Sequence, residues 1–432
     1  MSTISRRALL GSSLAVAGFS AVRNLPGNRF HPLDRVGREN LKITQVKVTP
    51  LSFELPPDKQ WMTGKQLIWK TDGILVEVST DQGVTGIGEP TPYGGPDHVK
   101  EFIDKYVTPT LIGQNPFDLE HLTTLWLGTT RGQQAAWAGI DNALWDIIGK
   151  VKNLPVWKLL ATDHPPQPHI RMYASGGVEY AWYKRPEALI EEAVRHKEEG
   201  YTAFKFRIGT DWQAAAMTVQ NYIPYLRKMR EAVGPNFDLI QESNMRLTLE
   251  QCLELCPVLE ELKFLWFEEP VPTREPGAIE AYIRINQALK AVKVSGGESR
   301  YTRQEFKEWV DRDAYEIVQP DMNCTGITEG WHIARMAHLK GKICCPHNWH
   351  GGLTTMANAA LVGAIPNRMM LELNQTFNPL KDEVFREPFV VRGGYLELPR
   401  KPGFGVELAP GLEKKFPYLP GHYAKPNSFL PA

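Results

Sequence analysis

From residue 169 onward the chain alternates short β-rich runs with amphipathic helical segments. The eight runs cover residues 170–174, 203–207, 238–242, 264–268, 292–294, 315–318, 342–345 and 369–373. Parallel strands need a crossover between them, usually a helix, so strands and helices in alternation favour a parallel sheet. Eight repeats predict an α/β fold with a (β/α)8 barrel over residues 169–385.

The first part of the chain follows a different pattern. Two runs read as strands, ITQVKVTPLSFEL and GILVEVSTDQGVTGIGE, and Asp81 to Gly83 form a hairpin turn inside the second. The segment PPDKQWMTGKQLIWK between them shows neither the helical nor the strand period of apolar residues. It predicts a loop that could close over a site. With helical periodicity beyond it, this predicts an α+β domain over residues 41–162, ended by the linker DHPPQP. The tail, residues 386–432, contains a hairpin pattern that we expect to pack back on this domain.

The N-terminus is typical of a twin-arginine export signal. Arg6 and Arg7 directly precede an uncharged run of small and apolar residues over 8–22. Fifteen residues are fewer than the roughly 20 that a membrane-spanning helix needs. We therefore interpret residues 1–22 as an export signal and expect a periplasmic protein. The alternative is a plain structured N-terminus.

Composition excludes some classes of partner. Lys plus Arg and Asp plus Glu each total 49, so the formal net charge is zero. This balance does not suggest a nucleic acid or an anionic membrane surface as a partner. Once the signal is removed, no remaining segment is long and apolar enough to span a bilayer. The five cysteines cannot all pair within one chain, and we expect mostly buried thiols.

Each predicted barrel strand ends near a polar residue. In a (β/α)8 barrel the active site lies at the carboxyl ends of the strands, so these side chains should meet at one mouth. Their spacing, from 23 positions (298 to 321) to 37 positions (205 to 242), is about one β/α unit. The set consists of Lys205, Glu242, Glu268, Glu298, Asp321, His347 and Glu372.

The acidic members of this set predict a metal site. Several carboxylates in one place repel one another unless a cation lies between them. Oxygen ligands favour a hard ion, Mg2+ or else Mn2+. Strand alternation in WFEEP directs Glu268 to the metal and turns Glu269 away, towards a structural ion pair. Asn244 shares a strand face with Glu242 and either supplies a further ligand or contacts the substrate.

His347 is the best candidate for a general base. It follows Asp321 by one β/α unit, and a carboxylate bonded to one imidazole nitrogen raises the basicity of the other. In the run FKFRIG, strand alternation directs Lys205 and Arg207 to the same face.

These residues resemble those of the enolase superfamily, and within it the mandelate racemase subgroup. The resemblance rests on AGIDNALWDIIGKVKNLPVWKLL, FKFRIG, QESN, WFEEP, GGES, QPDMNCTGIT, CCPHN and the strand that ends at Glu372. It implies an α+β capping domain over the barrel and a Mg2+ held by Glu242, Glu268 and Glu298. It also implies that the Asp321–His347 dyad removes the proton α to a carboxylate, giving an enediolate that Glu372 stabilises as an acid.

The sequence departs from the family pattern at two positions. Glu242 stands where the first metal ligand is commonly Asp. Arg207 stands where two-base relatives carry a second lysine, and a guanidinium with a pKa above about 12 is a poor base. We therefore expect Lys205 and Arg207 to face the barrel mouth and bind anionic oxygen.

One strong base favours one-sided chemistry, namely dehydration of an acid sugar to a 2-keto-3-deoxy acid. Two alternatives stay open: a carboxylic-acid racemase or epimerase with a second base such as Tyr173, and a sugar-acid-binding protein without turnover. The expected partner is a small-molecule carboxylate, and we expect a homo-oligomer. Substrate contacts are predicted from the capping loop and the strand ends, at Trp61, Lys65, Asn244, Asn323 and Trp349.

Overall fold

A computed structural model of the chain describes residues 31–63, 66–92, 94–127, 129–162, 164–179, 185–207 and 217–426. The predicted export signal with Arg6 and Arg7 lies outside these ranges, as does Lys65. Within them, no helix has both the length and the apolar character needed to cross a membrane.

The N-terminal part builds an antiparallel sheet covered by helices. Its strands are β1 (Ile43–Glu54), β4 (Lys70–Thr80) and β5 (Thr85–Gly88), in the order β1-β4-β5. The predicted turn is present: Gly83 has φ of 76° and its N–H donates to the carbonyl of Thr80 at 3.1 Å. The helices are α1 (Pro96–Phe102), α2 (Thr108–Leu111), α3 (Leu119–Thr124), α4 (Arg131–Val151) and α5 (Val156–Leu160).

Helix α4 packs very closely on this sheet. A Cβ atom on Gly86 or Gly88 would collide with the carbonyl oxygen of Ala143 or Gly139, both in α4. Glycine at these two strand positions therefore sets the helix-to-sheet distance.

The segment predicted as a loop between β1 and β4 contains a short hairpin instead. It consists of β2 (Trp61–Thr63) and β3 (Gln66–Ile68), and β3 also pairs with the C-terminal strand β16 (Ala424–Pro426). Three-residue strands are too short to show a period, and the partner that completes this sheet lies about 350 residues away in the sequence. The loop prediction was wrong for these reasons.

Eight strands form the parallel sheet of the barrel. They are β6 (His169–Gly176), β7 (Ala203–Arg207), β8 (Asp238–Glu242), β9 (Trp266–Glu268), β10 (Lys293–Gly296), β11 (Ile317–Val318), β12 (Ile343–Cys344) and β13 (Leu371–Asn374). They pair in chain order from β6 to β12, and β13 returns to pair with β6. A parallel bridge between Cys344 and Arg368 joins β12 to the segment that precedes β13. The predicted α/β barrel fold is confirmed.

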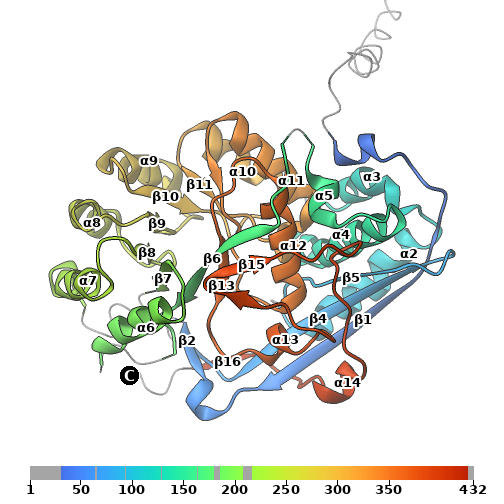
Figure 1. Cartoon of the computed structure of the whole chain (residues 1–432), viewed down its shortest axis with the longest axis horizontal. Helices are drawn as coiled ribbons and strands as arrows, with labels where there is room; N and C mark the ends of the chain where they lie inside the picture. The colour runs from blue at the N-terminus through green and yellow to red at the C-terminus, as the bar shows by residue number, and fades with distance from the viewer. Residues whose placement is uncertain are drawn as a thin grey trace, which may run out of the picture.

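Helices alternate with these strands. They are α6 (Glu187–Glu198), α7 (Val219–Val233), α8 (Leu249–Glu261), α9 (Ala278–Ala288), α10 (Arg303–Asp311), α11 (Met322–Leu339) and α12 (Gly352–Ala364). Thr218, Thr248 and Thr302 cap the N-termini of α7, α8 and α10 by accepting a backbone N–H. Figure 1 shows α6 to α9 on the side of the barrel away from the β1–β4–β5 sheet.

The C-terminal segment contacts both parts of the molecule. It contains α13 (Pro379–Asp382), the predicted hairpin of β14 (Val391–Arg392) and β15 (Tyr395–Glu397), and α14 (Leu412–Lys415). Strand β15 pairs with β6 of the barrel, whereas β16 pairs with β3. All five cysteines are free and buried, as predicted.

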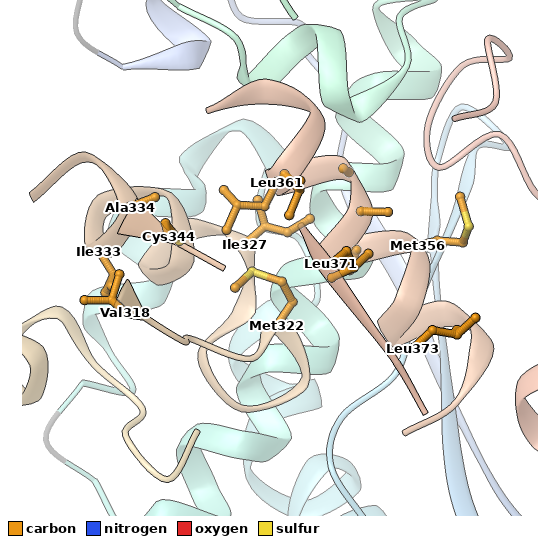
Figure 2. Close-up of a cluster of buried hydrophobic side chains, with 14 of the residues drawn as sticks. Val318, Met322, Ile327, Ile333, Ala334, Cys344, Met356, Leu361, Leu371 and Leu373 are labelled. Carbon is orange, nitrogen blue, oxygen red and sulfur yellow. The ribbon is translucent and has the colours of Figure 1, made fainter. Parts of the chain in front are cut away.

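Helices α4 and α11 join the N-terminal part to the barrel. The side chain of Asn142 donates to the carbonyl of Met322 at 2.8 Å, and Trp145 donates to the Thr328 hydroxyl at 2.9 Å. Behind this contact, apolar side chains of α11, α12 and β13 form a continuous core, in which Ile327, Leu361 and Leu371 lie together (Figure 2). The contact fixes the position of α11, whose first residues lie at the barrel mouth.

Candidate active site at the barrel mouth

The seven polar residues predicted at strand ends do converge on the barrel mouth. Strand register aligns two neighbouring members with Arg207, because Arg207 pairs with Glu242 and Glu242 pairs with Glu268. Asp321 is the N-cap of α11, and its side chain accepts the N–H of Asn323. A network of ion pairs then connects the set, as described below.

Glu242, Glu268 and Glu298 form a group that could hold a divalent cation. One carboxylate oxygen from each lies within 4.8 Å of the others. The donors are all oxygen atoms, which suits a hard ion rather than zinc. The donor set therefore fits the predicted metal.

Lys205 occupies a different position from the one we expected. Its side chain is fully buried, and its Nζ lies 3.3 Å from Glu242 and 2.8 Å from Glu372 and also forms an ion pair with Glu268. Burial lowers the pKa of Lys205, but the surrounding carboxylates outweigh burial and raise it well above its ordinary value. Lys205 thus lies among the glutamates below the cavity, with its ammonium group held by their carboxylates, and its contact with substrate oxygen stays a prediction.

Arg207 does line the mouth. Its Nε donates to Glu242 at 2.9 Å, and its guanidinium lies 5.1 Å from the centre of the Trp349 ring. Burial raises the pKa of Glu242, yet Arg207 and Lys205 together lower it to about 2. Glu242 is therefore ionised, and Arg207 keeps part of its guanidinium at the cavity.

His347 and Asp321 form the predicted dyad. The Nδ1 of His347 lies 2.6 Å from Asp321, and its Nε2 lies 3.2 Å from Glu298. Burial alone would lower the pKa of His347, but Glu298, Glu372 and Asp321 raise it to about 10. A cation held by Glu298 would cancel part of that negative charge and bring the pKa back towards neutrality.

The charges around Glu372 favour its deprotonated form in this arrangement. Burial raises its pKa, but the nearby cations Lys205 and His347 outweigh burial, so the net shift is downward. Its side chain is fully buried and accepts the N–H of Asn348 at 3.0 Å. The role of Glu372 as an acid towards the enediolate stays a prediction.

Two asparagines that we had not predicted hold the dyad and its neighbour in place. Asn348 donates its side-chain amide to the carbonyl of Glu372 at 2.9 Å. Asn358 of α12 donates to Asp321 and to Asn348, both at 3.3 Å. The position of Asn348 next to His347 is the only sequence signal for either residue.

Glu269 turns away from the mouth, as alternation predicted. Its carboxylate accepts the N–H of Gly297 at 2.9 Å rather than a cation. Burial and the nearby Glu298 raise its pKa to about 8. The ion pair expected for Glu269 is replaced by this hydrogen bond to the backbone.

A cavity of about 350 Å³ opens at the mouth. Its walls come from the β2–β3 hairpin, the barrel loops and the C-terminal segment, and they include Trp61, Arg207, Asn244, Glu298, Asp321, His347, Trp349 and Tyr423. Trp61, Asn244 and Trp349 thus lie where substrate contacts were predicted.

Two other predicted residues are not at this cavity. The side chain of Asn323 is fully buried, and its backbone carbonyl accepts the N–H of Thr91. Tyr173 is fully buried against Trp266, with ring centres 5.4 Å apart, and burial raises its pKa well above the ordinary value. Neither is among the described residues that line the cavity, so the structure gives no support to Asn323 as a substrate contact or to Tyr173 as a second base.

Two family models match the chain. The model described as "Mandelate racemase / muconate lactonizing enzyme, N-terminal domain" matches residues 57–161. The model described as "Enolase C-terminal domain-like" matches residues 188–412. Together they cover β4, β5, helices α1 to α5 and most of the barrel.

Individual proteins resemble the chain over most of their length. It is 31% identical to an arabinonate dehydratase of Saccharolobus solfataricus over 79% of this chain and 90% of the relative. It is 29% identical to a D-galactarolactone cycloisomerase of Agrobacterium fabrum over 85% of this chain and 97% of the relative. The crystal structure of an enolase superfamily member from Polaromonas sp. JS666 matches with a TM-score of 0.78 and 31% identity, over 88% of this chain and 98% of that chain.

Proposed function

Because this chain belongs to the enolase superfamily, in its mandelate racemase and muconate lactonizing enzyme branch, we propose that it is a metal-dependent dehydratase of acid sugars. The observation that carries the proposal is the His347–Asp321 dyad beside three convergent glutamates. The Nδ1 of His347 lies 2.6 Å from Asp321, whereas the Nε2 of His350, which also lines the cavity, lies 3.9 Å from that carboxylate, and burial lowers the pKa of His350 to about 4. Chemistry from one face of the substrate follows from a single base.

The cation is proposed to be Mg2+, held by Glu242, Glu268 and Glu298. When bound, it would draw electron density from a substrate carboxylate and make the neighbouring α proton more acidic. Arg207 contributes a fixed positive charge at the same wall of the cavity, which favours anionic oxygen.

His347 performs both proton transfers in this proposal. Its Nε2 accepts the α proton, and the electron pair of the broken C–H bond moves into the carboxylate to form an enediolate. When that pair returns, the C–O bond at the β carbon breaks, and the hydroxyl leaves as water with the proton from His347. The resulting enol becomes a 2-keto-3-deoxy acid, so the net change is the loss of one water.

The alternative is isomerase chemistry, which the name of the cycloisomerase relative supports. Racemisation or epimerisation by two bases needs a proton acceptor on the second face of the α carbon. Arg207 stays protonated there, since Glu242 and other nearby carboxylates raise its pKa further despite burial. Dehydration is therefore the first choice.

A panel of mono- and di-acid sugars tests the proposal. We expect a 2-keto acid product from at least one of them, with loss of the α hydrogen measured in D2O. Exchange with inversion but no keto product would favour an epimerase, and binding without either would favour a non-catalytic sugar-acid-binding protein.

The periplasmic location is a separate proposal, supported by Arg6 and Arg7 before the uncharged run 8–22. Changing both arginines to lysine should leave an unprocessed precursor in the cytoplasm; normal export of the double variant would contradict the proposal. The expected homo-oligomer also stays a prediction, which the molar mass in solution measures.

A further inference from the structure

One cationic side chain at the cavity has no partner among the described residues. Of these residues, three with Arg or Lys side chains line the cavity: Arg207, Lys70 and Arg274. Arg207 is bonded to Glu242, and Lys70 lies 3.1 Å from Asp72 and donates to the carbonyl of Leu419. Arg274 lies in the loop between β9 and α9, is exposed, and has no ion pair or hydrogen bond among the described residues.

An exposed arginine alone is usually just solvated, but the neighbours of Arg274 make this one different. Arg131, at the start of α4, stacks its guanidinium 5.0 Å from the ring centre of Tyr301, which also lines the cavity. The Nη1 of Arg131 is buried and lacks a hydrogen-bond acceptor among the described residues. Its nearest carboxylate partner, Glu305, is 4.0 Å away from its Nη2.

Positive charge therefore exceeds negative charge on this side of the cavity. Burial lowers the pKa of Arg131, and the nearby cations Arg274 and Arg300 lower it further against the opposing effect of Glu305. Arg131 is also the first residue of the 21-residue helix α4, whose N-terminus adds a partial positive charge. An anion bound at Arg274 would relieve this repulsion.

We infer that Arg274, Arg131 and Tyr301 form a subsite for a second carboxylate, so that the preferred substrates are diacid sugars (aldarates) rather than monoacid sugars. The inference rests on the proposed function, because the reacting carboxylate is assigned to the glutamates and Arg207 at the other wall. The planar guanidinium of Arg274 matches a carboxylate with two parallel hydrogen bonds. Arg131, stacked on the Tyr301 ring, adds positive charge next to this position.

The test compares two acids that differ only at the distal carbon, galactarate and galactonate, together with glucarate and gluconate. Replacing Arg274 by Met should lower kcat/KM for the diacid about 10- to 100-fold, the size of a lost charge-assisted contact, and leave the monoacid unchanged. Arg274→Lys should restore part of the loss. Arg284→Met, at an exposed position of α9, is the matched control and should change neither acid.

Binding gives a second readout that does not need turnover. In the His347→Asn background, titration calorimetry should show tighter binding of the diacid than of its monoacid, and Arg274→Met should remove that difference. Equal effects of Arg274→Met on both acids, or no effect on either, would overturn the subsite while leaving the dehydratase proposal intact.

If no acid sugar yields a keto acid but the Arg274-dependent preference persists in binding, the proposed function fails and the subsite stands. Absence of any diacid preference in binding overturns the subsite.

Discussion

Two groups of buried carboxylates in this molecule are stabilised in different ways. At the contact between α4 and the barrel, Asp141 accepts the N–H of Thr328 at 2.9 Å and the hydroxyls of Thr328 and Thr123. At the barrel mouth, Glu242 and Glu268 are instead compensated by the cations Lys205 and Arg207. The donors to Asp141 are part of the chain and are always present. At the mouth, a bound metal ion could take over part of the charge compensation that Lys205 and Arg207 provide.

The comparison separates a structural carboxylate from a catalytic one. Burial raises the pKa of Asp141 to about 7, despite the hydrogen bonds from Thr328. At the mouth, Arg207 and Lys205 outweigh burial and lower the pKa of Glu242 to about 2. Glu242 therefore stays ionised although it is buried, which suits a metal ligand, whereas Asp141 takes up a proton at the contact between two parts of the fold. Glu268 lies between these cases: burial and the nearby Glu242 and Glu372 raise its pKa to about 7 against the effect of Lys205, so a bound cation is needed to keep it ionised. Four predictions test this distinction, in order of their expected effect on turnover.

Removal of the metal should have the largest effect. Chelation should abolish product formation and lower the melting temperature, because Glu242, Glu268 and Glu298 then repel one another, and added Mg2+ should restore both. Glu268→Gln should behave like chelation, since it removes the charge with little change in shape.

The matched control for Glu268→Gln is Glu269→Gln. Glu269 is the next residue along the chain, and its pKa of about 8 means that it is already largely protonated at neutral pH. Its Oε1 accepts the N–H of Gly297, and a glutamine oxygen can do the same. Turnover and stability should therefore change little. Full activity of a chelated sample, or equal loss in the two variants, would contradict the metal assignment.

Loss of the base should have the next largest effect. His347→Asn should lower kcat about 100- to 10,000-fold, the usual contribution of a general base. It should also stop exchange of the α proton with D2O, measured by NMR. His338→Asn, an exposed position of α11, is the control and should retain activity. Exchange that persists in His347→Asn would reveal a second base and make the epimerase the better proposal.

Most of the barrel mouth could be predicted from the sequence, because the carboxyl ends of all strands in a (β/α)8 barrel lie at the same face. The periodic β/α units therefore identified Glu242, Glu268, Glu298, Asp321 and His347 as neighbours. The ion pairs that bury Lys205 could not be predicted, since alternation gives the face of a strand but not the depth of a long side chain.

The contact between the two parts of the fold was much less predictable. The sequence AGIDNALWD shows helical periodicity, but its Asp141 and Asn142 have partners about 180 residues away in α11. Asn358, which holds Asp321, likewise depends on the packing of α12 against the barrel. No local pattern encodes such partners. The hairpin β2–β3, completed by β16, was missed for this reason as well.

Arg207 should contribute less than the base does. Arg207→Met should lower kcat/KM by roughly 1.5 to 3 kcal/mol, the range for a charge-assisted hydrogen bond. Part of this loss arises because Glu242, at 2.9 Å, loses its guanidinium partner. Steady-state kinetics with a saturating metal measures the effect.

Arg207→Lys sharpens the same test: if Arg207 lies on the opposite face of the substrate from His347, this substitution places there a group that can lose its proton. Exchange of an α proton of the opposite configuration would support that geometry. An Arg207→Met variant with unchanged kinetics would show that the guanidinium does not act on the substrate.

The smallest effect on turnover is expected at Asp141, where the consequence is a pH dependence of stability. Its pKa is about 7 in the folded protein and 3.8 ordinarily, so between these values the folded state binds more protons than the unfolded state. Its contribution to stability is therefore fully present below about pH 4 and is lost as the pH rises to 7, by up to about 1.4 kcal/mol per pH unit.

Asn mimics the protonated acid and cannot titrate. The Asp141→Asn variant should thus have the stability of the wild type near pH 4 and should retain turnover. Its free energy of unfolding should fall less steeply between pH 4 and pH 7. Part of the fall should remain, because Glu89 also has a pKa of about 7. Urea denaturation at several pH values measures both slopes, and identical slopes would show that Asp141 is ionised at the contact with α11, like the carboxylates of the mouth.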